Sequence, residues 1–103
     1  MTLNGCSFDV PYVGEPAAGL DAARLGFEKL GYTVKKRADG AVTMAFKGTF
    51  FGTDPAKFSH SATVEVFEGG LRFTFSTGLK ASTWGKANIE WAMARAAKVL
   101  EGG

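Results

Sequence analysis

Three short segments in the middle of the chain alternate apolar and polar residues without interruption. Their apolar members are Val42-Met44-Phe46, Ala62-Val64-Val66 and Leu71-Phe73-Phe75. Successive side chains of a strand point to opposite faces of a sheet, so each segment predicts a strand with one buried face. The turn signals Asp39-Gly40 and Gly69-Gly70 separate these segments from their neighbours and predict tight hairpins.

The rest of the chain adds two helical patterns and two further strands. Leu20, Ala23, Phe27 and Leu30 recur at helical spacing, and Gly31 follows as a helix-terminating residue. Pro11 cannot donate a ladder hydrogen bond, so the first strand is expected at a sheet edge. We predict strands over residues 7–13, 32–37, 41–51, 59–67 and 71–77, and helices over 17–30 and from 83 or 88 to 100.

The order β-α-β-β-β-β-α predicts the fold class. Four consecutive strands joined by short turns form an antiparallel meander. With the first strand this gives an α+β two-layer sandwich, a five-stranded antiparallel sheet covered on one face by two helices. At 103 residues we expect one domain over residues 1–103. This order of elements resembles the TATA-binding-protein-like topology, a class that includes helix-grip proteins of the START type.

The last helix is expected to have an apolar side and, opposite it, a side that combines tryptophan with basic residues. We expect one stripe, which covers the sheet, to consist of Ile89, Met93, Ala96 and Leu100. The opposite side then carries Trp84, Trp91, Arg95 and Lys98. Tryptophan beside arginine is typical of interface hot spots, so this side is a candidate interface. The alternative is that both indoles pack on the domain itself, as tryptophan usually does.

The sheet face turned away from the helices is a second candidate surface. Its expected members are Lys35, Arg37, Thr43, Lys47, Thr49, Thr63, Glu65, Arg72, Thr74 and Ser76, with Phe51 and Phe67 at the same parity. Such a face could meet a second sheet or stack single-stranded bases, or it could be an ordinary solvated face. The net charge of +2 and Glu65 disfavour nucleic acid as a partner.

Candidate chemistry is sparse. His60 is the single histidine, and between Ser59 and Ser61 we expect it to be a partly exposed polar residue. Cys6 has no basic neighbour that would lower its pKa, so it is not expected to be a nucleophile. We therefore predict no catalytic residue, no metal site and no cofactor, and a protein that is not an enzyme.

Composition bears on the compartment. One cysteine excludes an internal disulfide and fits a reducing compartment, and no run approaches the length of a membrane span. The expectation is a cytoplasmic protein without a membrane partner.

The function that these patterns favour is binding, with a homo-oligomer as the expected partner. The alternative, implied by the helix-grip resemblance, is a small apolar or aromatic ligand between the sheet and the last helix. The residues expected to line that pocket are Phe46, Phe73, Phe75, Trp91 and Met93.

Overall fold

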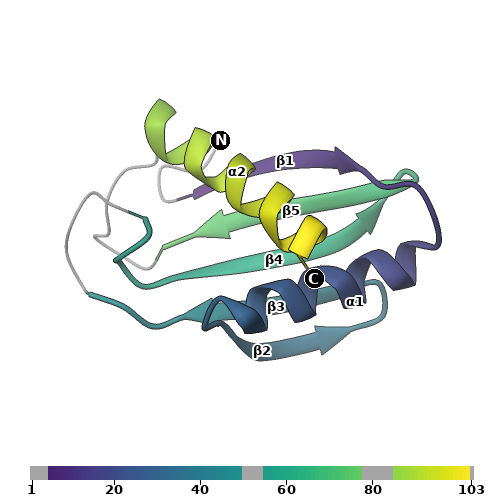
Figure 1. Cartoon of the computed structure of the whole chain (residues 1–103), viewed down its shortest axis with the longest axis horizontal. Coiled ribbons are helices and arrows are strands. Elements are labelled where there is room, and N and C mark those ends of the chain that lie inside the picture. The colour runs from purple at the N-terminus through teal and green to yellow at the C-terminus, as the bar shows by residue number, and fades with distance from the viewer. Residues whose placement is uncertain (1–4, 50–54, 78–84, 103) are drawn as a thin grey trace.

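The computed structural model describes residues 5–49, 55–77 and 85–102. Five strands and two helices follow one another in the predicted order (Figure 1). They are β1 (Gly5–Pro11), α1 (Pro16–Lys29), β2 (Thr33–Ala38), β3 (Ala41–Phe46), β4 (His60–Phe67), β5 (Gly70–Ser76) and α2 (Lys86–Gly102). The predicted α+β sandwich is confirmed.

The sheet is antiparallel throughout, with the strand order β1-β5-β4-β3-β2. The strands β2 to β5 form the predicted meander, and β1 pairs with β5. This pairing places Pro11 on an edge strand, as its missing N–H requires. The predicted third strand is too long, because β3 ends at Phe46 and the described residues that follow, 47–49, contribute an isolated bridge between Thr49 and Phe58. Residues 50 and 51 of that prediction lie outside the described residues.

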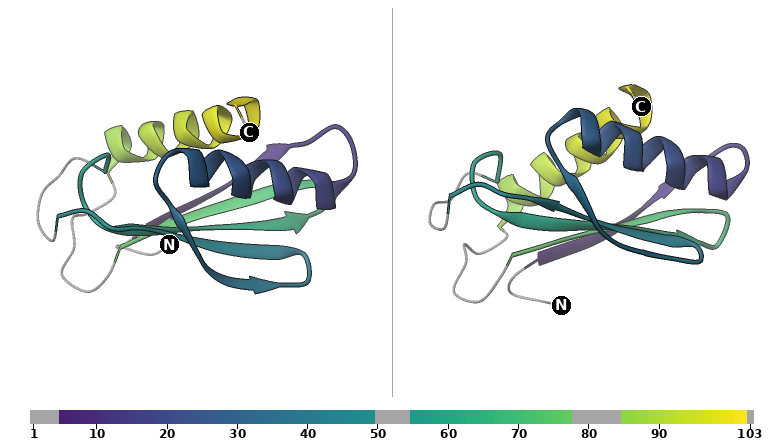
Figure 2. Two further views of the ribbon diagram at one scale, coloured as in Figure 1. Left: turned by 60° about the horizontal axis from the view of Figure 1, so that its bottom comes forward. Right: turned by 90° about the horizontal axis from the view of Figure 1, so that it is seen from below.

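Both helices lie on one face of the sheet and leave the other face open (Figure 2). The inner face is built from the three apolar segments that alternate in the sequence. Phe8, Phe73, Val64 and Val42 lie opposite one another across four strands and make one inner row. Of these, Val64 and Phe73 are fully buried and Val42 is 5% exposed, so the predicted parity of the three alternating segments is confirmed.

The two helices meet along a seam of small residues. A methyl group added at Gly26 of α1 would lie 2.2 Å from the carbonyl oxygen of Val99, so this contact requires glycine. Ala92, Ala96 and Val99 form the buried stripe of α2. Close approach of helix backbones favours small side chains, and here they occupy the positions that face the core.

This packing corrects the predicted orientation of α2. Met93 is 51% exposed and does not face the core, so its place in the inner stripe was wrong. Trp91, expected on the outer side, packs against the core and contacts Phe75 with ring centroids 5.9 Å apart. Ala96 is buried as predicted and Leu100 packs against the core, so the helix is rotated only in part from the predicted orientation, with Trp91 turned toward the sheet.

Candidate functional site

Aromatic rings lie between the sheet and the first half of α2. They surround the single histidine, and we call this group the aromatic–histidine cluster. Its members are Tyr32, Phe46, Phe58, His60, Phe75 and Trp91. The ring centroid of His60 lies 5.2 Å from that of Phe46, 5.5 Å from that of Trp91 and 6.0 Å from that of Phe75.

Both ring nitrogens of His60 are engaged. Nδ1 lies 3.0 Å from the carbonyl oxygen of Phe58, and Nε2 lies 2.5 Å from the hydroxyl oxygen of Tyr32. A carbonyl oxygen can only accept, so Nδ1 carries the proton and donates to Phe58. In the neutral ring Nε2 is then the acceptor, and the Tyr32 hydroxyl donates to it.

Burial keeps this pair uncharged. Desolvation lowers the pKa of His60 below its ordinary value; the hydrogen bond to Phe58 opposes this change, and the charge of Arg95 adds to it. Desolvation also raises the pKa of Tyr32, against a smaller opposite effect of Arg95. At neutral pH the cluster therefore contains a neutral imidazole and a neutral phenol.

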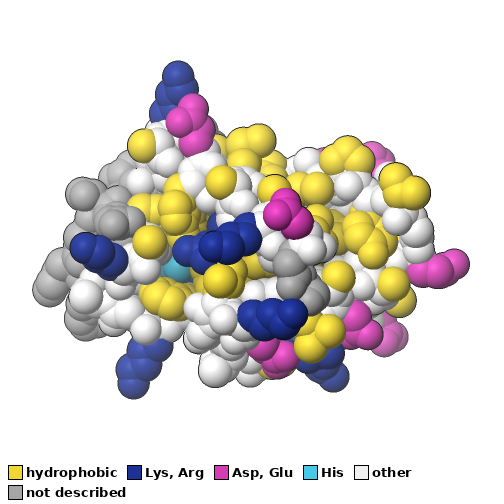
Figure 3. Space-filling model, in the orientation of Figure 1, with side chains coloured by type: hydrophobic (Ala, Val, Ile, Leu, Met, Phe, Trp, Pro, Cys, Tyr) yellow, Lys and Arg dark blue, Asp and Glu magenta, His cyan; other side chains and the backbone are white. Residues whose placement is uncertain are grey.

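Arg95 covers the cluster from α2. Its guanidinium carbon lies 4.7 Å from the centroid of the Trp91 ring, within the range of a cation–π contact. On the face of the molecule that carries the helices, a small area of histidine surface lies in a recess bordered by hydrophobic and basic side chains (Figure 3). His60 is 6% exposed, so the ring edge reaches this recess although the residue is buried.

The expectation of a partly exposed His60 was therefore wrong. The signal that places it inside was present in the sequence, because His60 has the same strand parity as Ala62, Val64 and Val66. The expectation of exposure was based instead on the polar neighbours Ser59 and Ser61.

The structure brings together some of the residues predicted to line a ligand pocket. Phe46, Phe75 and Trp91 belong to the aromatic–histidine cluster. Phe73 is fully buried farther along the core, with its ring centroid 6.0 Å from that of Phe8. Met93 points away, as described above.

The residues predicted to form an interface lie in different places. Arg95 covers Trp91, Lys98 is exposed on α2, and Phe67 lies on the open face of the sheet. Trp84 and Phe51 are outside the described residues. The described members therefore do not form one patch.

Three cross-strand hydroxyl pairs lie on the open sheet face. Oxygen–oxygen distances are 3.0 Å for Ser7–Thr74, 3.1 Å for Thr43–Thr63 and 2.9 Å for Ser61–Ser76. Each pair joins neighbouring strands, so these hydroxyls bond to one another on the predicted outer face.

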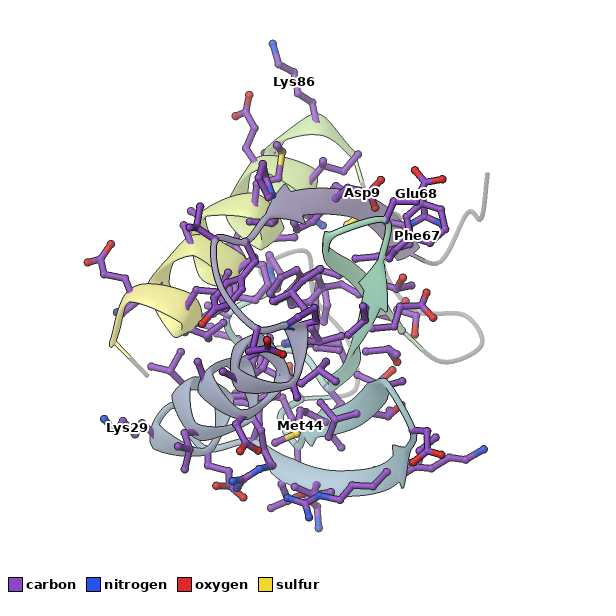
Figure 4. The ribbon with its side chains drawn as sticks, turned by 90° about the vertical axis from the view of Figure 1, so that its right-hand side faces the viewer. Asp9, Lys29, Met44, Phe67, Glu68 and Lys86 are labelled. Atoms are coloured by element: carbon purple, nitrogen blue, oxygen red, sulfur yellow. The ribbon has the colours of Figure 1, made fainter. Side chains whose placement is uncertain are left out.

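A charged group lies at one end of this face. Arg72 donates two hydrogen bonds to Asp9, at 2.7 Å and 3.2 Å, and its guanidinium carbon lies 3.6 Å from the ring centroid of Phe67. The Arg72 hydrogen bond lowers the pKa of Asp9 below its ordinary value. Asp9, Phe67 and Glu68 gather at this end in Figure 4, where Met44 points between the sheet and α1.

Comparison with known proteins finds no family model that matches the chain, and the curated proteins include none similar to it. Among the described residues, no three His, Cys, Asp or Glu side chains are grouped so that they could hold a metal ion. No helix in the described part of the chain is long and apolar enough to cross a membrane.

Proposed function

We propose that this chain is a small non-catalytic domain that binds an aromatic or apolar small molecule between the sheet and α2. The observation that carries the proposal is the hydrogen-bonded His60–Tyr32 pair inside a shell of aromatic rings. Sites for small molecules typically combine an apolar lining with a few convergent polar groups. The helix-grip resemblance of the topology supports the same location.

The geometry favours binding over catalysis. Both nitrogens of His60 are held by neighbours of its own chain, and burial opposes the charged form. A general base must offer a free nitrogen to the proton that it takes up. We expect a ligand to stack on the aromatic rings where Arg95 now covers Trp91, and to exchange hydrogen bonds with the His60–Tyr32 pair.

A matched pair of phenylalanine substitutions tests this site. Calorimetric titration with 2-naphthol, an aromatic alcohol, should show saturable binding with one molecule per chain. Phe46→Leu removes a half-buried ring from the cluster, and we expect it to weaken binding about tenfold, the order of one lost aromatic contact. Phe67→Leu makes the same change on the open sheet face and should leave the affinity unchanged. Equal effects of both substitutions, or no saturable binding, would contradict the proposal.

A second candidate function is self-association through the open sheet face. The hydroxyl pairs favour it, because hydroxyls that already bond to one another lose little when water is excluded. Two such faces could pack against each other as in a β-sandwich. The orientation of Trp91 argues against the α2 face that the sequence suggested.

Sedimentation velocity at micromolar concentration tests this candidate. We expect a dimer that Thr63→Lys converts to a monomer, because the substitution places a charge in the middle of the hydroxyl rows. Ala94→Lys introduces the same charge on the exposed side of α2 and should leave the dimer intact. A monomeric wild-type chain, or dissociation by Ala94→Lys alone, would show that the sheet face is not the interface.

A further inference from the structure

A second recess lies away from the aromatic–histidine cluster and shares no residue with it. It is a groove of about 230 Å³ between α1 and the β2–β3 hairpin. The lining residues are Ala17, Leu20, Asp21, Arg24, Arg37, Ala38, Ala41 and Val42. Five of these eight are apolar, and the three charged ones are two arginines and one aspartate.

An irregularity in β2 is what brings Arg37 to this groove. The register between β2 and β3 shifts between Val34 and Lys36. A bulge reverses the side-chain parity beyond it, so Lys36 lies opposite the outward Thr43 and Arg37 opposite the buried Val42. The predicted position of Arg37 on the open sheet face was therefore wrong, since that prediction assumed an uninterrupted strand.

The two arginines differ in their partners. Arg24 donates to Glu28 at 2.9 Å and lies 3.6 Å from Asp21, yet its buried Nε has no hydrogen-bond partner. Arg37 has no ion pair within the described ranges. A buried donor without an acceptor is rare in folded proteins, so the Arg24 guanidinium, which lines the groove, is incompletely paired. The lining carries two positive charges and one negative charge, and Glu28 pairs with Arg24 from outside the lining, so the unneutralised cation of the groove is Arg37.

We propose that this groove binds a small monocarboxylate with a short apolar body. The carboxylate would pair with Arg37 and Arg24, since guanidinium groups bind carboxylates through paired hydrogen bonds. The apolar body would cover Leu20, Ala41 and Val42. A volume of about 230 Å³ is below the usual range for drug-sized ligands, so the ligand is a small acid.

Titration with hexanoate, followed by amide chemical shifts in NMR spectra, tests the proposal. We expect saturable shifts at residues that line the groove, and no saturable shifts with hexan-1-ol, which has the same chain without the charge. Arg37→Gln should weaken hexanoate binding about tenfold, the order of one lost charge-assisted hydrogen bond. Lys36→Gln removes a charge from the neighbouring position on the opposite face and should leave the affinity unchanged.

A third variant tests the groove without removing a charge. Ala17→Leu fills it from α1 at an exposed helical position, where leucine is nearly as favourable as alanine. It should abolish hexanoate binding while the melting temperature stays unchanged. Equal binding of hexan-1-ol, no saturation by hexanoate, or equal effects of Arg37→Gln and Lys36→Gln would overturn the proposal. None of these results bears on 2-naphthol binding at His60.

Discussion

Phe73→Ala is expected to lower the free energy of unfolding by about 3–5 kcal/mol, the usual loss when a buried phenylalanine is truncated. Phe73 is fully buried, and its ring lies between Phe8 of β1 and Phe27 of α1, with centroid distances of 6.0 Å and 6.3 Å. The cavity would therefore open between the sheet and α1. Small domains are stable by about 5–15 kcal/mol, so urea denaturation should show a large shift of the midpoint.

Thr74→Ala is the control in the same strand. Thr74 lies on the open sheet face and shares a hydrogen bond with Ser7, so we expect a loss of about 1 kcal/mol. The contrast between adjacent residues tests the parity of β5, because a register slip by one residue exchanges the two faces. A wild-type midpoint for Phe73→Ala together with a large loss for Thr74→Ala would contradict the described sheet.

The sheet could be predicted from the sequence because its information is local. Apolar residues alternate without a break in β3, β4 and β5, and Pro11 restricts β1 to an edge. Gly40 adopts a left-handed φ of 74°, as the Asp-Gly turn signal requires. Each of these features determines the backbone within a few residues of itself.

The orientation of α2 could not be predicted in this way. Its buried stripe consists of Ala92, Ala96 and Val99, while the larger Met93 is exposed. Met93 was expected to be buried because its side chain is large and apolar. The close approach of Gly26 to the backbone of Val99 instead favours small residues where the two helices meet. That choice depends on a contact between residues 26 and 99, which no local pattern contains.

The candidate sites depended on the same kind of distant contact. The partner of His60 is Tyr32, which directly follows the turn after α1 and is 28 residues earlier in the chain. Strand parity alone predicts that His60 faces inward, but it does not predict that the Tyr32 hydroxyl is its partner. Similarly, nothing in the sequence Lys35-Lys36-Arg37 predicts the bulge that places Arg37 in the same groove as Arg24.

Acid is expected to destabilise the fold through His60. In the folded state its pKa lies below the ordinary value of 6.5, because burial disfavours the charged ring. Below about pH 6.5 the unfolded chain therefore binds a proton that the folded chain does not. The contribution of neutral His60 to the free energy of unfolding is therefore complete above this pH. As the pH falls toward the lowered pKa, the free energy of unfolding decreases by at most about 1.4 kcal/mol per pH unit.

Urea denaturation at several values between about pH 7.5 and pH 5 measures this loss, with His60→Gln as the control. Glutamine can donate and accept hydrogen bonds but does not titrate, so the variant should be less stable at neutral pH and nearly independent of pH in this window. Asp9, whose pKa is lowered by Arg72, stabilises the fold above its ordinary value of 3.8, and that contribution is lost only below this window. Parallel pH profiles for the wild type and His60→Gln would mean that His60 does not remain neutral in the folded protein, and the buried hydrogen bond from Tyr32 to its Nε2 would then be wrong.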